Sequence, residues 1–208
     1  KNKFDPFILE IINDIADSNE SLITSSCNDD NSLFDKLSYY LIHENRKDMI
    51  YRLYNRLLIA LKKNLSVELI SSLIETESQN NEFWIFMNTL LLKMGIYVFN
   101  PESRLKLIDY IQSSNQLPEK VSFVNFFKNF FLLINVYETR IQSLKKNKTQ
   151  IPNKYVIPTT RLIFEERFLE MILEFNDNNI VALLIESFLD IYSHLDRKLN
   201  IVPIFEQL

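Results

Sequence analysis

Residues 83–99 read FWIFMNTLLLKMGIYVF, and this stretch decides the fold. Asn88, Thr89 and Lys93 are its only polar residues ahead of the glycine. A helix that is apolar nearly all round must be buried on several sides, so it needs neighbouring helices. Residues 121–137, VSFVNFFKNFFLLINVY, have the same character. Two such helices predict a domain of stacked helices with an internal layer.

One glycine, Gly95, occurs among the 208 residues, where average usage would supply about 15. Glycine permits positive φ in tight turns and lets the backbone approach phosphate groups closely. The glycine-rich loops of nucleotide-binding enzymes and the tight turns of β-hairpins are therefore not available to this chain. No segment alternates convincingly between apolar and polar residues as a half-buried strand does. We expect an all-α fold and a protein that is not an enzyme.

Few side chains suit metal or covalent chemistry. Cys27 is the single cysteine, and His43 and His194 are the two histidines, far apart in the sequence. They form neither a metal-ligand pattern nor a nucleophile–base pair, so we expect no metal and no cofactor. A cysteine without a disulfide partner fits a reducing intracellular compartment, cytoplasmic or nuclear. No uninterrupted apolar run reaches the roughly 18 residues of a membrane-spanning helix, so we predict no membrane span.

Helical spacing and capping residues predict about nine to ten helices. Nine lie near residues 6–16, 33–43, 46–63, 67–76, 81–94, 101–113, 121–144, 160–175 and 178–194. The last residues, IVPIFEQL, look like the opening of another. Residues 145–158 contain two prolines and are predicted to form an irregular insertion loop. Because the chain begins without methionine, we expect residues 1–208 to be one helical-repeat domain of a larger protein.

The helices that begin near residues 33, 67 and 102 start successive antiparallel pairs about 34 residues apart. Their apolar rows consist of bulky Phe, Leu and Ile, and they lack the Trp, Gly, Ala and Tyr consensus of tetratricopeptide repeats. The pattern resembles the armadillo and HEAT repeats of α-solenoids over most of the chain. This resemblance implies stacked antiparallel helix pairs that present a long surface to partners.

Trp84 and Asn88 are one candidate binding pair. Armadillo peptide receptors use a Trp and an Asn one helical turn apart, and the Asn bonds the backbone of an extended peptide. The pairs Tyr51/Asn55 and Phe131/Asn135 repeat this spacing with other aromatic residues. Such pairs occur about as often as chance predicts, so core aromatics beside incidental asparagines are the alternative interpretation. For Trp84 itself, the alternatives are a core position and a rim position that anchors a partner.

Basic residues supply the other candidate sites. Arg52, Arg56 and Lys63 share one face of a predicted helix, where phosphate or an acidic partner could bind. The alternative is an ordinary solvated helix face. In the predicted loop, Lys145, Lys146 and Lys148 suit weak electrostatic contact, with a plain solvated loop as the alternative.

The leading hypothesis is a non-enzymatic scaffold or adaptor module that binds protein partners within a larger intracellular complex. It follows from the helix pairs, the near-absence of glycine and the lack of a catalytic constellation. The alternative is a helical-repeat domain that contacts nucleic acid or phosphates through the basic face. The distribution of charge discriminates between them. Basic groups gathered on one face favour nucleic acid, and interspersed acidic groups favour a protein partner.

Overall fold

The computed structural model describes residue 39, residues 47–143 and residues 162–193. Of these residues, 80% are helical and none lies in a β-strand. The described part of the chain is therefore all-α, as the sequence predicts. The predicted helices at residues 6–16 and, apart from Tyr39, 33–43 lie outside it, as does the predicted loop at residues 145–158. The total of nine to ten helices and the solenoid arrangement stay predictions.

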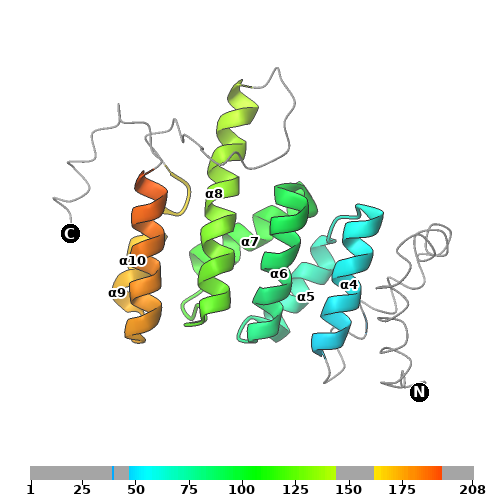
Figure 1. The fold of residues 1–208 in the computed structure, drawn as a ribbon, viewed down its shortest axis with the longest axis horizontal. Helices are drawn as coiled ribbons and strands as arrows, with labels where there is room; N and C mark the ends of the chain where they lie inside the picture. Colours follow the sequence, from blue (N-terminus) through cyan, green and yellow to red (C-terminus); the bar gives the residue numbers. More distant parts are fainter. Residues whose placement is uncertain (1–38, 40–46, 144–161, 194–208) are drawn as a thin grey trace. The chain divides into compact units, whose positions relative to one another are not determined.

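The chain consists of two compact units, a first unit up to Pro118 and a second unit from Glu119 onward. Seven α-helices and one 3-10 helix are described in them (Figure 1). The first unit contains α4 (Lys47–Leu61), α5 (Val67–Glu77), α6 (Asn81–Met94), η1 (Gly95–Val98) and α7 (Pro101–Ser113). The second unit contains α8 (Val121–Ser143), α9 (Glu165–Glu174) and α10 (Asn178–Ser193).

Side-chain caps fix the starts of α5, α6 and α7. The Ser66 side chain accepts a hydrogen bond from the N–H of Leu69 and so begins α5. Asn80 does the same for α6, and Asn100 for α7, where Pro101 occupies the first helical position. These bonds satisfy backbone donors that a helix leaves without partners at its N-terminus.

Backbone conformation sets the helix ends. At Gly95 φ is +70°, and its N–H bonds the carbonyl of Leu91, which ends α6 where predicted. α4 ends at Leu61, not at residue 63, because Lys62 has a positive φ of 50°. The N–H of Lys63 then bonds back to the carbonyl of Leu58, 3.1 Å away. The predicted bounds of α4 are wrong by two residues at this end.

The core of the first unit surrounds α6. Six of its residues are buried: Phe83, Trp84, Phe86, Met87, Leu90 and Leu91. In the first unit, α4 packs against α6 and α5 packs against α7 (Figure 1). The ring of Phe86 lies 4.8 Å from that of Tyr51 on α4, and the ring of Trp84 lies 6.1 Å from that of Tyr110 on α7. The prediction that α6 is an internal helix is confirmed, with Leu91 fully buried.

Backbone hydrogen bonds also join two connections of the first unit. The N–H of Leu65, between α4 and α5, donates to the carbonyl of Val98 at 2.8 Å. Leu65 and Phe99 thereby form a single parallel β-bridge. The Ser103 hydroxyl of α7 donates to the carbonyl of Leu65 at 2.9 Å. Both polar groups of the Leu65 backbone are satisfied although its side chain is fully buried.

Phenylalanine rings fill the core of the second unit. Phe168 of α9 is fully buried among rings from two other helices. Its ring centre lies 4.9 Å from Phe127 and 5.7 Å from Phe131 on α8, and 5.5 Å from Phe188 on α10. Tilted and edge-on ring contacts of this kind add to the stabilisation from burial. α10 accordingly packs against both α8 and α9.

Asn135 of α8 holds the segment that leads into α9. Its amide Oδ1 accepts the N–H of Ile163 at 2.9 Å, and its Nδ2 donates to the Ile163 carbonyl at 3.3 Å. Phe164, the next residue, has φ of 71° and a buried side chain. A left-handed residue cannot continue a helix, so α9 begins at Glu165 and not near residue 160. The predicted start of this helix is wrong for that reason.

Glu119 caps the start of α10 from outside the helix. Its carboxylate accepts the backbone N–H groups of Asn176 at 2.9 Å and Asp177 at 3.0 Å. Asp177 in turn accepts the N–H of Asn179 at 2.8 Å. The N–H of Asp177, together with the bonds from Asn176, lowers the pKa of Glu119 below its ordinary value.

We expect Leu91→Ala to lower the free energy of unfolding by about 2–5 kcal/mol, because it leaves a cavity inside the core. Urea unfolding measures the change. Leu92→Ala is the matched control, since the neighbouring Leu92 side chain is exposed. An unchanged urea midpoint for Leu91→Ala would show that α6 is not the core helix.

Asn135→Ala should destabilise the second unit by about 1–3 kcal/mol, because the backbone N–H and carbonyl of Ile163 lose their partner. Asn125→Ala on the same helix is the control, since the Asn125 side chain makes no hydrogen bond within the described residues. Urea unfolding and amide exchange at Ile163 report the effect. Equal stability of the two variants would contradict a structural role for the Asn135 amide.

Glu119→Gln should flatten the dependence of stability on pH in the acid range. Because the folded pKa of Glu119 is lowered, the charged carboxylate stabilises the fold above its unfolded pKa of about 4.3. That contribution is lost as the pH falls through the lower folded pKa. The gap in urea midpoint between wild type and variant should therefore be largest near neutral pH and shrink in acid. A gap that does not change with pH would refute this account.

Candidate functional site

The described residues contain no group of three or more His, Cys, Asp and Glu side chains placed to hold a metal ion. Within the same ranges, no helix combines the length and hydropathy needed to cross a bilayer. The three residues that the sequence singles out for such chemistry, Cys27, His43 and His194, lie outside the described part. The candidate sites are therefore surfaces of helices.

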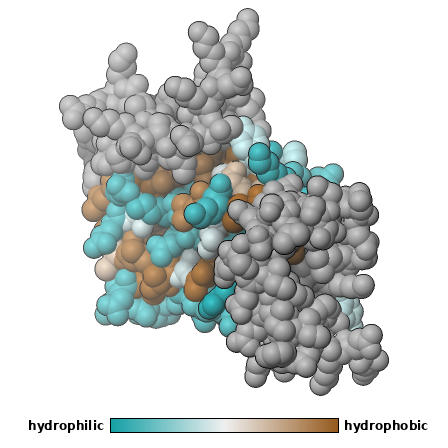
Figure 2. Space-filling model, turned by 45° about the vertical axis from the view of Figure 1, so that its right-hand side comes forward, coloured by the Kyte–Doolittle hydropathy of each residue, from teal (hydrophilic) through white to brown (hydrophobic). Residues whose placement is uncertain are grey.

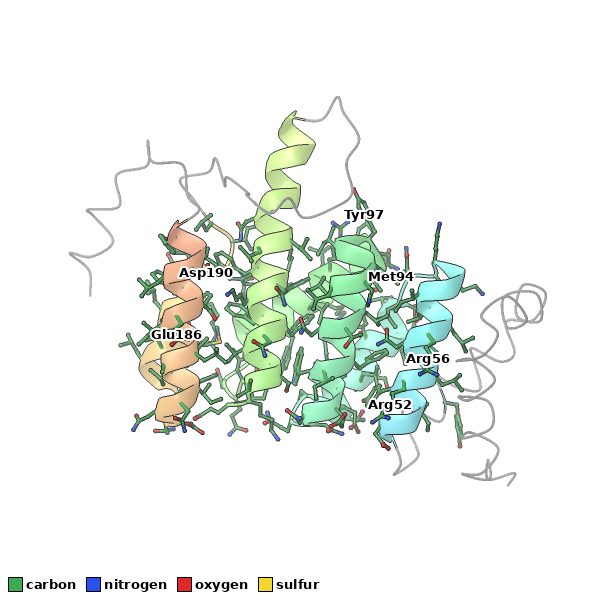
Figure 3. The ribbon with its side chains drawn as sticks, viewed as in Figure 1. Arg52, Arg56, Met94, Tyr97, Glu186 and Asp190 are labelled. Atoms are coloured by element: carbon green, nitrogen blue, oxygen red, sulfur yellow. The ribbon has the colours of Figure 1, made fainter. Side chains whose placement is uncertain are left out.

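Arg52 and Arg56 lie on the same side of α4, one turn apart (Figure 3). Arg52 is exposed and Arg56 is half-buried. Asp48, also exposed, precedes Arg52 by one turn on this face. Lys63 is half-buried in the connection that follows α4, so it does not belong to the helix face as predicted. The basic row on α4 consists of two arginines with a carboxylate beside them.

The first unit has no excess of positive charge. Its described cationic side chains are Arg52, Arg56, Lys62, Lys63, Lys93, Arg104 and Lys106. Its described carboxylates are Asp48, Glu68, Glu75, Glu77, Glu82, Glu102 and Asp109. A surface that tracks a phosphate backbone needs an excess of positive charge. By sequence, residues 1–118 contain twelve Lys and Arg residues against sixteen Asp and Glu residues.

Trp84 lies in the core and not at the rim. Its side chain is fully buried, and its indole Nε1–H donates to the carbonyl of Ser78 at 2.7 Å. Asn88, one turn further along α6, is half-buried. The aromatic partners in the other two pairs, Tyr51 and Phe131, are buried as well. The aromatic residues of all three pairs therefore belong to the core, and the Asn135 amide is already bonded to the backbone of Ile163.

The remaining predicted site residues are Lys145, Lys146 and Lys148. They lie outside the described residues. Their part in binding stays a prediction.

Exposed apolar side chains are the feature that sequence reasoning missed. On α6, the residues Ile85 and Leu92 are 43% and 54% exposed, although the helix is internal on its other sides. On α10, Ile185 and Leu189 are 41% and 50% exposed, and Leu173 on α9 is 77% exposed. Figure 2 shows apolar residues interspersed with polar ones over the described surface. The missed signal was a second apolar row on helices whose first row already fills the core.

The hydroxyls of Tyr51 and Tyr192 have raised pKa values for structural reasons. Burial raises the pKa of Tyr51, and the nearby charges of Glu77 and Glu82 raise it further. Burial also raises the pKa of Tyr192, whose hydroxyl donates to Glu165 and so links α10 to α9. In both, the neutral phenol is favoured, which suits a packed position between helices.

Comparisons with known proteins add no family to this geometry. No protein-family model matches the chain. No curated protein and no solved structure matches it either. The candidate sites in the described residues are the exposed helix surfaces given above.

Proposed function

We propose that the chain is a non-enzymatic protein-interaction module of the α-solenoid type, acting as a scaffold or adaptor within a larger intracellular complex. Support for a repeat architecture comes from the order of helix contacts. α4 packs on α6, α5 packs on α7, and α8 packs on α10. In stacked helix pairs, each helix contacts its counterpart in the next pair, which is two helices further along the chain.

The observation that carries the proposal is the outward apolar row on an otherwise buried helix. Ile85 and Leu92 are seven residues apart on α6, so both lie on one side of the helix. Single exposed apolar residues need no explanation, whereas rows with polar borders are typical of protein-binding surfaces. Lys93 at the end of α6 and Glu82 near its start supply polar borders of both signs.

The balance of charge favours a protein partner over nucleic acid. The first unit has no excess of cationic residues, and Asp48 accompanies Arg52 and Arg56. Interspersed charges of both signs weaken attraction to a phosphate backbone. They suit the polar rim of a protein interface, where complementary charges select the partner. An intracellular location, cytoplasmic or nuclear, is part of the same proposal.

Affinity capture with the intact parent protein, followed by crosslinking and mass spectrometry, tests the proposal. We expect partner crosslinks at exposed lysines of the first unit, such as Lys93 and Lys106. The double variant Ile85→Ser/Leu92→Ser should lose capture while its urea midpoint changes little, because both side chains are already exposed. Glu68→Gln/Glu75→Gln on α5 is a control for exposed positions outside the row.

Binding of DNA and RNA is measured on the same protein. We expect no submicromolar binding at an ionic strength of about 0.15 M. Salt-sensitive binding that Arg52→Glu/Arg56→Glu abolishes would contradict the proposal and establish the nucleic-acid alternative. Capture that survives the double serine variant would remove the α6 row as the binding surface.

A further inference from the structure

α10 has apolar residues on two opposite sides. Its inward side is buried and contains Ile180, Leu184, Phe188 and Ile191. Beyond its first two residues, the exposed residues follow one stripe, which we call the α10 outer face and which consists of Ala182, Ile185, Glu186, Leu189 and Asp190. A helix at a protein surface normally carries a single apolar stripe, facing the core. The second apolar stripe on α10 is therefore a candidate surface for contact with another molecule.

The apolar and acidic residues of the α10 outer face form two parallel rows. Ile185 and Leu189 are one turn apart, and Glu186 and Asp190 are one turn apart beside them. Figure 3 shows the two acidic residues on the same side of α10. The face therefore combines an apolar ridge with an adjacent line of carboxylates.

The two carboxylates of this face differ in their partners. Asp190 forms an ion pair with Lys128 of α8, with Nζ and Oδ2 2.7 Å apart. The Glu186 side chain makes no ion pair or hydrogen bond within the described residues.

The negative charge of Glu186 and Asp190 indicates which kind of partner fits the α10 outer face. An apolar ridge beside carboxylates complements a helix with leucine-like residues at spacings of three and four and with Lys or Arg along the flank. The apolar residues of that helix gain from contact with Ile185 and Leu189, and its cations approach Glu186 and Asp190. An acidic partner would meet repulsion from the carboxylates of the same face.

We propose that the α10 outer face docks a basic amphipathic helix of a partner protein. This inference rests on the proposed interaction function and names the class of partner. The partner helix lies along α10, with its apolar side over Ile185 and Leu189 and its cations toward Glu186. Because opposite charges accelerate encounter, binding weakens as salt rises.

Fluorescence anisotropy with two labelled peptides tests the inference on the intact chain. One peptide is a designed amphipathic helix of leucine and lysine, about 18 residues long, and the other replaces each lysine by glutamate. We expect the lysine peptide to bind and the glutamate peptide to bind at least about tenfold more weakly. Equal binding of the two peptides would overturn the inference.

Matched variants locate the binding on α10. Glu186→Lys and Leu189→Ser should each weaken binding of the lysine peptide by about tenfold. Their controls are Glu75→Lys on α5 and Leu105→Ser on α7, which make the same changes at other exposed positions. Each control should stay within about twofold of wild type. If the α10 variants behave like their controls, the inference is wrong.

Two further readouts separate the remaining outcomes. A dimer in sedimentation velocity that Leu189→Ser dissociates would assign the face to a second copy of this chain and overturn the inference. Capture of a partner that persists in both α10 variants would leave the proposed function standing and remove the α10 outer face from it. If the wild-type protein captures no partner at all, the proposed function itself is contradicted.

Discussion

The burial of α6 is the constraint on which the first unit depends. Its apolar residues occupy so much of the circumference that one neighbouring helix cannot cover them. α4 contacts it through Tyr51 and Tyr54, and the aromatic ring of Trp84 reaches Tyr110 on α7. Burial of this many large side chains contributes most of the favourable free energy of folding. The caps and hydrogen bonds then decide where each helix starts and stops.

Local sequence signals predicted the helix bounds where the deciding interactions are local. Asn80 and Asn100 cap the helices that follow them, and Gly95 ends α6, so these bounds could be taken directly from the chain. The start of α9 could not. It depends on the bonds between Asn135 and Ile163, which are 28 residues apart in sequence. The residues next to Ile163 in the sequence give no sign that the Ile163 backbone is bonded to a side chain of another helix.

The candidate surfaces were less predictable than the fold, for a related reason. Arg52 and Arg56 were placed on an accessible face because charged residues avoid the core. From the sequence alone, Trp84 could lie in the core or at the rim, because an indole N–H can be buried only where it finds an acceptor. In the structure the Ser78 carbonyl is that acceptor. Ile185 and Leu189 were missed because hydropathy indicates which residues prefer burial and not which neighbour buries them. Two apolar rows on one helix indicate only that the helix needs two contacts.

The bridge between Leu65 and Phe99 has a consequence for how the first unit comes apart. The bond from Leu65 to Val98 joins peptide groups, and the Ser103 hydroxyl completes the junction. Side chains at residues 65 and 99 can therefore change without removing the link, provided that they still fill the buried space. Separating α5 from α7 would break this link and expose the peptide groups at its centre. The two connections thus open together, which makes the helices on either side of them one cooperative block.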